Sequence, residues 1–135
     1  RKAAAFRRRH PALKRRTFFS GFDHSGNGIP DILWTGRTLR QPAWNHPGRR
    51  HICYQIDGSD IPSAEGPHFL YFIFNSDGRS HTFTLPTHDG MRWHRVVDTA
   101  RSAGSDFLDP STEEPLPDGD QYKAGARSAV VLLAR

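Results

Sequence analysis

The chain has 135 residues and a mass of 15.3 kDa, the size of one domain, and 36% of its residues are hydrophobic. A chain of this size and composition can bury a packed core, which excludes wholesale disorder. Its longest apolar runs, residues 69–74 and 129–134, have six residues each, against about 20 for a membrane-spanning helix. We therefore expect no membrane span and no secretory signal. A single cysteine, Cys53, excludes an intrachain disulfide and favours a cytoplasmic protein.

The net charge of +5 is distributed unevenly along the chain. Residues 1–50 contain 12 Lys and Arg against 2 acids, whereas residues 51–135 contain 7 against 12. Eight of the cations lie in the first 16 residues. Such a basic arm suits either the phosphates of a nucleic acid or a solvated helix face. Because the rest of the chain is acidic, we favour the solvated face and expect no nucleic-acid partner.

Residues 1–17 are predicted to form mainly a helix. The segment 3–9 is rich in alanine and arginine, which are strong helix formers. Phe6, His10 and Leu13 would share one face of that helix. A helix of about 14 residues with two large apolar side chains is not stable alone in water, so we expect its partner surface to lie outside this chain. Pro11 is expected to bend the last turn. The helical pattern is already under way at Arg1, as it would be in a longer protein.

Residues 18–50 have the composition of an ordered connecting segment. Turn-forming Gly, Pro and Asp are frequent, and regular periods are few. Large apolar side chains are nevertheless spaced throughout: Phe18, Phe19, Phe22, Ile29, Ile32, Trp34, Leu39 and Trp44. We therefore expect the segment to lie flat against other structure.

Residues 51–135 predict an antiparallel β-sandwich, which makes the whole fold mainly β. Five short runs rich in β-branched and aromatic residues, at 51–56, 69–75, 81–85, 93–98 and 128–134, are separated by Gly, Pro, Asp and Ser. No helical stretch lies between them, which indicates antiparallel sheets. The last run is apolar throughout, so we expect a central or well-paired strand. Residues 106–120 are expected to form an acidic surface loop.

The segment 23–31 resembles part of a calcium loop. Oxygen-bearing side chains at Asp23, Ser25, Asn27 and Asp31 surround a glycine at the sixth position. The twelfth position, where an EF-hand needs a bidentate Glu, is Trp34. The two alternatives are a weak calcium site and an Asx-type turn, and we favour the turn.

No catalytic constellation is evident. The eight histidines are scattered without zinc-ligand spacing, and no nucleophile elbow or phosphate loop is present. We therefore expect no catalytic residue, metal or cofactor. Trp34, Trp44 and Trp93 could stack on sugar rings, and we retain Trp34 and Trp44 as carbohydrate-binding candidates, although packing is the favoured role for each tryptophan.

Several separated pieces resemble the end of an isoamylase-type glycogen debranching enzyme, a family of the α-amylase clan of glycoside hydrolases. They are residues 7–16, the Phe18-Phe19-Ser20-Gly21 and Gly28–Trp34 segments, Trp44-Asn45, residues 69–75, 83–86 and 93–100, and Arg127-Ser128. The resemblance covers essentially the whole chain. The segment 35–39 is shorter than is usual in the family.

The resemblance implies an upstream barrel that hydrolyses α-1,6 branch linkages in glycogen or related glucans, followed by this C-terminal sandwich. Residues 1–17 would be the end of the last barrel helix, and the family's catalytic carboxylates have no counterpart here. Three functions remain open: a structural and interaction module of a debranching hydrolase, which we favour; a glucan-binding module; and a basic nucleic-acid-binding protein. Aromatic side chains exposed in a row on the sandwich would favour the second. The implied partners are the upstream barrel and, through the parent enzyme, branched α-glucan.

Overall fold

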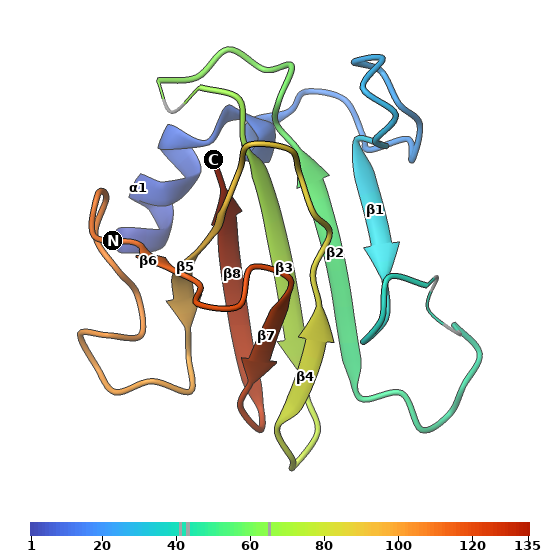
Figure 1. The fold of residues 1–135 in the computed structure, drawn as a ribbon, viewed down its shortest axis with the longest axis vertical. Helices are drawn as coiled ribbons and strands as arrows, with labels where there is room; N and C mark the ends of the chain where they lie inside the picture. Colours follow the sequence, from blue (N-terminus) through green and yellow to red (C-terminus); the bar gives the residue numbers. More distant parts are fainter. Residues whose placement is uncertain (41, 43, 65) are drawn as a thin grey trace.

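The computed structural model describes residues 1–40, 42, 44–64 and 66–135, and two antiparallel sheets dominate this part of the chain (Figure 1). The large sheet has the strand order β1-β2-β3-β8-β5-β6, and the small sheet pairs β4 with β7. The strands are β1 (Ile32–Thr35), β2 (His51–Asp57), β3 (Phe69–Asn75), β4 (His81–Thr84), β5 (Trp93–Asp98), β6 (Glu114–Pro115), β7 (Gln121–Ala124) and β8 (Ser128–Ala134). A helix, α1 (Lys2–Arg9), and a 3-10 turn, η1 (Pro11–Lys14), precede them. The predicted mainly β antiparallel fold is confirmed.

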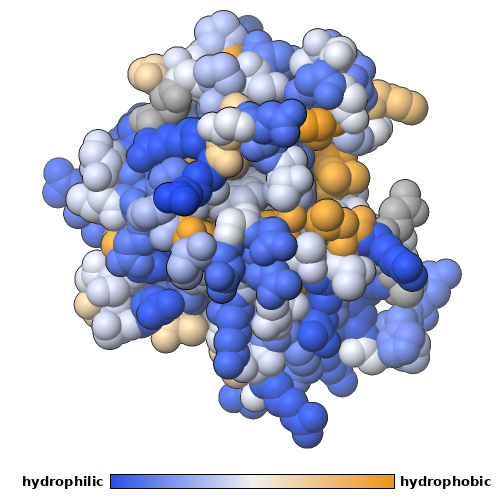
Figure 2. Space-filling view, in the orientation of Figure 1, coloured by the Kyte–Doolittle hydropathy of each residue, from blue (hydrophilic) through white to orange (hydrophobic). Residues whose placement is uncertain are grey.

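The main core lies between the two sheets. In Figure 1 the small sheet, β4 and β7, lies in front of the large sheet, and we call the covered side the front face. Alternate residues of β3 and β8, such as Tyr71 and Leu132, point into this core and meet Phe83 and Tyr122 from the small sheet. The outer surface on this side is mostly hydrophilic, with apolar side chains gathered in a small area (Figure 2). The front face is thus closed by the chain itself.

The strand β8 is central in the large sheet, as its apolar run predicted. It pairs antiparallel with β3 on one side and with β5 on the other. Its side chains alternate between the two faces: Val130 and Leu132 enter the front core, whereas Leu133 enters a second cluster behind the sheet. Burial on both faces explains why this run lacks the polar alternation of a surface strand.

The back face of the large sheet carries α1 (Figure 1). Phe6 is only 5% exposed and shares an apolar cluster with Leu70, Val96 and Leu133. The expectation that the apolar side chains of this segment have no partner within the chain is therefore wrong, because Phe6 lies in this cluster and Leu13 packs against it. Helical periodicity identifies an apolar face, but it does not tell which surface covers that face.

The helix is also shorter than expected. It ends at Arg9, and the His10 N–H donates the last helical hydrogen bond to the Phe6 carbonyl. Pro11 then starts η1 instead of bending a continuing helix. Proline has no N–H and favours a first-turn position, which explains the break. No helix among the described residues is long and apolar enough to cross a membrane.

Three strands were missing from the prediction. β1 lies inside the connecting segment, where Ile32 pairs with Ile56 and Trp34 with Tyr54. β6 is a two-residue pairing within the acidic loop, and β7 follows that loop and pairs with β4. These strands have two or four residues, too few for a period of two to be recognised. Their partners are distant in the sequence, so pairing rather than local pattern defines them.

Candidate functional site

A row of aromatic side chains occupies the part of the back face that α1 leaves open. It crosses three strands: Trp34 on β1 lies opposite Tyr54 on β2, which lies opposite Phe72 on β3. Residues 34, 54 and 72 point to the same side of the sheet because they are register partners. We call this row, completed by the neighbouring Trp44 and Phe74, the aromatic face.

Two rings of the aromatic face stack on each other. The ring centroids of Tyr54 and Phe72 are 4.9 Å apart and their planes differ by 14°. That separation equals the spacing of about 4.8 Å between neighbouring strands. Tyr54 and Phe72 are therefore nearly parallel, stacked rings on neighbouring strands.

The two tryptophan candidates lie together at one end of this row. Trp34 lies 4.9 Å from Tyr54 with an interplanar angle of 52°, and 5.5 Å from Trp44 with an angle of 73°. Trp44 comes from the connecting segment, and the Arg49 guanidinium lies 5.3 Å from its ring. Such edge-to-face and cation–π contacts hold the indoles in place. The fold therefore brings together residues that are ten positions apart in the sequence.

A substantial part of the aromatic face is exposed to solvent. Trp34 is 38% exposed, Phe74 44% and Trp44 56%, and the adjacent Ile52 is 43% exposed. Tyr54 is half-buried within the row, and this burial raises the pKa of its hydroxyl. Scattered exposed apolar residues are ordinary on proteins, whereas a contiguous row of them makes the aromatic face the candidate binding surface.

Sequence reasoning did not identify Tyr54, Phe72 and Phe74 as site residues. Residues 69–74 form one unbroken apolar run, which is typical of a strand buried on both faces. In the structure Phe72 is half-buried and Phe74 is exposed on the open part of the back face. The sequence did show that both the odd-numbered and the even-numbered residues of this strand are apolar. It did not show that the helix on the back face is too small to cover all of them.

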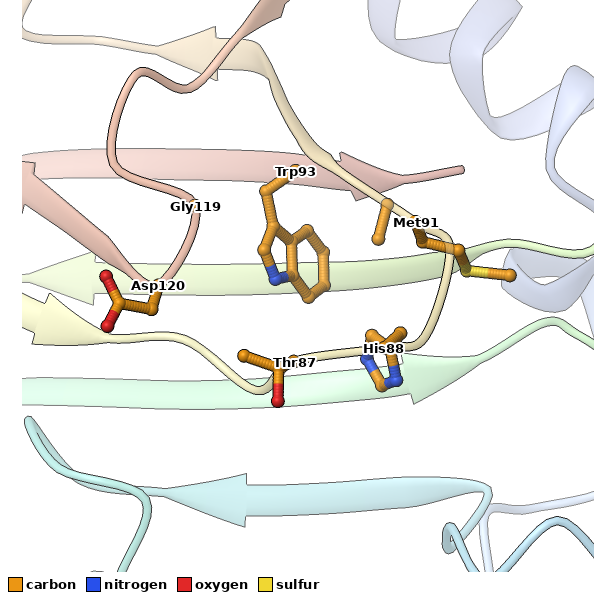
Figure 3. A pocket seen from close by; sticks show the side chains of 7 residues that line it. Thr87, His88, Met91, Trp93, Gly119 and Asp120 are labelled. Atoms are coloured by element: carbon orange, nitrogen blue, oxygen red, sulfur yellow. The ribbon is translucent and has the colours of Figure 1, made fainter.

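Trp93 has a structural role. It is 2% exposed, and its indole N–H donates a 2.7 Å hydrogen bond to the Pro86 carbonyl. It borders a hollow of about 330 Å³ that Figure 3 shows from close by, lined also by Thr87, His88, Met91, Gly119, Asp120 and Ala134. His88 stacks on Phe69 at 3.7 Å and pairs with the Gln55 side chain at 2.8 Å. The aromatic groups around this hollow are engaged in packing.

Asp23, the first residue of the calcium-like loop, is hydrogen-bonded to the backbone of its own loop. The Asp23 carboxylate accepts hydrogen bonds from the backbone N–H groups of Gly28, Gly26 and Ser25, at 2.8, 2.8 and 3.0 Å. These bonds, led by that from Gly28, keep the pKa of Asp23 below its ordinary value. This is the Asx-type arrangement that we favoured.

The other oxygen-bearing residues of that loop have different partners. The Ser25 hydroxyl lies between Asp23 at 3.2 Å and Asp57 on β2 at 3.4 Å. The Asn27 amide donates to Asp57 at 2.8 Å, while Asp31 accepts bonds from the backbone of Ser20 and Gly21. The oxygen atoms of these four side chains, Asp23, Ser25, Asn27 and Asp31, therefore do not converge on one point. Within the described ranges, no three His, Cys, Asp or Glu side chains are grouped to hold a metal.

Two of the scattered histidines form a buried pair behind the sheet. His10 Nδ1 lies 3.3 Å from His68 Nε2, and His68 Nδ1 lies 2.9 Å from the Gly66 carbonyl. A carbonyl only accepts, so His68 carries its proton on Nδ1 and His10 donates to His68 Nε2. Burial, together with the nearby His68 and Arg9, lowers the pKa of His10 to about 4. The pair fastens the chain beyond α1 to the start of β3.

The sequence of this chain matches a known protein family and several known proteins. A family model described as "Isoamylase, C-terminal" matches residues 33–133, and the chain belongs to that family. It is 30% identical to the isoamylase of a Flavobacterium species over 97% of this chain and 18% of that protein. It is 30% identical to the Pseudomonas amyloderamosa isoamylase, over 97% of this chain and 16% of that protein. It is 29% identical to a glycogen operon protein GlgX homolog of Mycobacterium tuberculosis, over 98% and 19%. The chain thus spans less than a fifth of the length of these relatives.

Proposed function

We propose that this chain is the C-terminal domain of a cytoplasmic enzyme that hydrolyses α-1,6-glucosidic branch linkages in glycogen or a related glucan. In that enzyme it serves as a structural and interaction module without catalytic carboxylates. Relatives named isoamylase and glycogen operon protein support the proposal, as does a family model described as C-terminal. In this proposal residues 1–17 are the end of a barrel helix, residues 18–50 are the connection and residues 51–135 are the sandwich, to which β1 of the connection adds an edge strand. The family model begins inside the connection, at residue 33.

The aromatic face is the observation that supports the module role. The chain closes the front face with β4 and β7, yet covers only part of the back face with α1. The uncovered rings lie on the same side of the sheet as α1, the side on which a preceding barrel helix would lie. The catalytic barrel of the same polypeptide is therefore the partner that covers the aromatic face, because stable interfaces bury aromatic side chains at their centre.

Glucan binding is the second candidate, since a row of exposed aromatic rings is what a sugar-binding surface would show. A glucan chain stacks its apolar sugar faces on the flat sides of aromatic rings and needs polar groups for its hydroxyls. Here Tyr54 and Phe72 stack on each other, so each covers a flat side of its neighbour, and the row contributes only one hydroxyl and two indole N–H groups. The scarcity of polar groups favours docking against protein. Trp44, the most exposed ring of the aromatic face, is the residue on which a glucan would depend.

Lys2 and Arg15, two of the eight cations of the basic N-terminal segment, make contacts within the fold. Lys2 pairs with Asp109 at 3.2 Å and donates to the Phe107 carbonyl at 2.8 Å. Arg15 lies 3.6 Å from the buried Asp31 and donates to the Asp57 carbonyl. These contacts support a structural role over nucleic-acid binding.

The test compares this chain with the longer polypeptide that contains it. The longer polypeptide should release reducing ends from glycogen by cleaving α-1,6 linkages, and this chain alone should give the buffer rate. A Phe74→Arg variant should shorten the thermal half-life of the longer enzyme while leaving the unfolding temperature of this chain unchanged. Hydrolysis by repurified chain, or the absence of α-1,6 cleavage by the longer polypeptide, would contradict the proposal.

Affinity electrophoresis through a glycogen-containing gel decides between docking and glucan binding. We expect this chain and its Trp44→Ala variant to migrate equally with and without glycogen. Retardation of the wild type that Trp44→Ala abolishes would establish the glucan-binding function instead.

A further inference from the structure

The segment between η1 and β1 presents two phenylalanines to solvent. Phe18 is 100% exposed and Phe22 is 70% exposed. Phenylalanine has no polar group to offset the exposure of its ring, so a fully exposed Phe is unfavourable in water. We call residues 18–22 the Phe loop. Neither the aromatic face nor the family match explains why these rings point outward.

The Phe loop is fixed in place by a buried carboxylate. Asp31, 3% exposed, accepts hydrogen bonds from the backbone N–H groups of Ser20 at 2.9 Å and Gly21 at 2.8 Å. In return, the Asp31 N–H donates to the Phe22 carbonyl at 2.9 Å. Burial alone would raise the pKa of Asp31, but these backbone hydrogen bonds outweigh it and the pKa lies below its ordinary value. The loop backbone is therefore held at Ser20, Gly21 and Phe22.

Further contacts stiffen the same loop. The Ser20 hydroxyl accepts a hydrogen bond from the Phe22 N–H at 3.2 Å and contacts His24 Nε2 at 2.6 Å. Gly21 has a φ of +77°, a conformation that a side chain would strain. The Arg15 guanidinium, 3.6 Å from Asp31, lies 5.3 Å from the Phe19 ring. These contacts fix the backbone of residues 20–22, which carries the exposed Phe22 ring and follows Phe18 by two residues.

Rigid, outward-pointing aromatic rings are the form that a docking anchor takes. Fixing the backbone before binding removes the entropy loss that a flexible loop would suffer on docking. Buried aromatic anchors supply most of the binding energy at protein interfaces. We propose that Phe18 and Phe22 insert into apolar pockets of the catalytic domain of the same polypeptide, with Asp31 as the residue that positions them.

The choice of occupant rests on the proposed function and on two observations. The matched relatives are more than five times as long as this chain, and the family domain is described as C-terminal, so a large partner is part of the same polypeptide. The two rings are phenylalanines, which lack the polar edge that Tyr and Trp offer to a sugar. A second copy of this chain is the alternative occupant, and the experiment separates it.

Hydroxyl-radical footprinting tests the proposal directly. In this chain alone, Phe18 and Phe22 should be labelled rapidly, like the exposed Leu39 in the segment that follows β1. In the longer polypeptide, labelling of Phe18 and Phe22 should fall several-fold while that of the buried Phe83 stays low in both. Unchanged labelling of Phe18 and Phe22 in the longer polypeptide would overturn the proposal.

A double variant, Phe18→Ser with Phe22→Ser, gives an independent readout. It should leave the unfolding temperature of this chain unchanged and lower that of the longer polypeptide by several degrees, whereas Leu39→Ser should change neither. Equal effects in the two contexts would overturn the proposal. So would a concentration-dependent dimer of this chain that the double variant disperses, because the occupant would then be a second copy.

The outcomes also distinguish this proposal from the proposed function. If the longer polypeptide lacks α-1,6 cleavage but protects the Phe loop, the enzyme assignment fails and the docking anchor stands. If the longer polypeptide cleaves glycogen branches but leaves Phe18 and Phe22 fully labelled, the enzyme assignment stands and the anchor fails.

Discussion

The two faces of the large sheet differ in how completely the chain covers them. On the front, β4 and β7 close a core in which Tyr71, Phe83 and Leu132 are fully buried. On the back, α1 buries Leu70 and Leu133, but Trp34 and Phe74 stay exposed on the same side. Elements of this chain close the front core, whereas part of the back face stays open. In our proposal that open part receives the catalytic barrel.

Removal of β8 is the change with the largest expected effect, because both faces depend on this strand. β8 pairs with β3 and β5 and contributes side chains to both apolar clusters. Deleting residues 128–135 should abolish cooperative unfolding, since the loss exceeds the roughly 5–15 kcal/mol that stabilises a typical domain. Circular dichroism during a thermal ramp would check this. A sharp transition at the original temperature would show that β8 is not central.

The front core predicts the next largest effect. Phe83 on β4 is fully buried among front-face residues. Phe83→Ala should reduce the free energy of unfolding by about 3–5 kcal/mol, the usual loss for a buried ring replaced by a cavity. Urea titration of this chain measures the change. A loss similar to that of an exposed residue would mean that the small sheet does not close the front face.

The part of the back face that α1 covers should respond to acid. The pKa of His10 is about 4 in the folded chain because of its burial and the nearby His68, Arg9 and Arg135, whereas the ordinary value is 6.5. Below pH 6.5 the unfolded chain therefore binds a proton that the folded chain does not, so stability falls as the pH drops from about 6.5 to about 4. His10 contributes about 3 kcal/mol at most to this loss. Burial also lowers the pKa values of His51 and His88, which adds to the same slope.

Proton NMR of the His10 ring separates its contribution from the others. Its titration midpoint should lie near pH 4, and urea titrations should give a shallower pH dependence for His10→Phe than for the wild type. A midpoint near 6.5, with the same slope in both proteins, would mean that α1 and His68 do not bury this ring in solution.

The sequence could predict the elements that have strong local patterns, but not those that depend on pairing between distant strands. β3, β5 and β8 have the predicted bounds, because long β-branched and aromatic runs are strong local signals. β1 was missed because its four residues have no alternation, and its assignment depends on pairing with β2. Trp34 and Trp44 were recognised as candidates by residue type. The stacking of Tyr54 on Phe72 depends on the strand register, which local sequence patterns do not determine.

The open part of the back face should give the smallest effect. Phe74 is 44% exposed, and its ring lies 6.3 Å from that of Tyr54. Phe74→Ala in this chain should therefore change the free energy of unfolding by less than about 1 kcal/mol, as is usual for surface positions. Phe83→Ala serves as the matched control, since it removes the same ring from the covered face of the sheet. Urea titrations of both variants, run side by side, measure the contrast. If Phe74→Ala destabilises the chain as strongly as Phe83→Ala, the aromatic face belongs to the core of this domain, and the argument that it is kept for a partner fails.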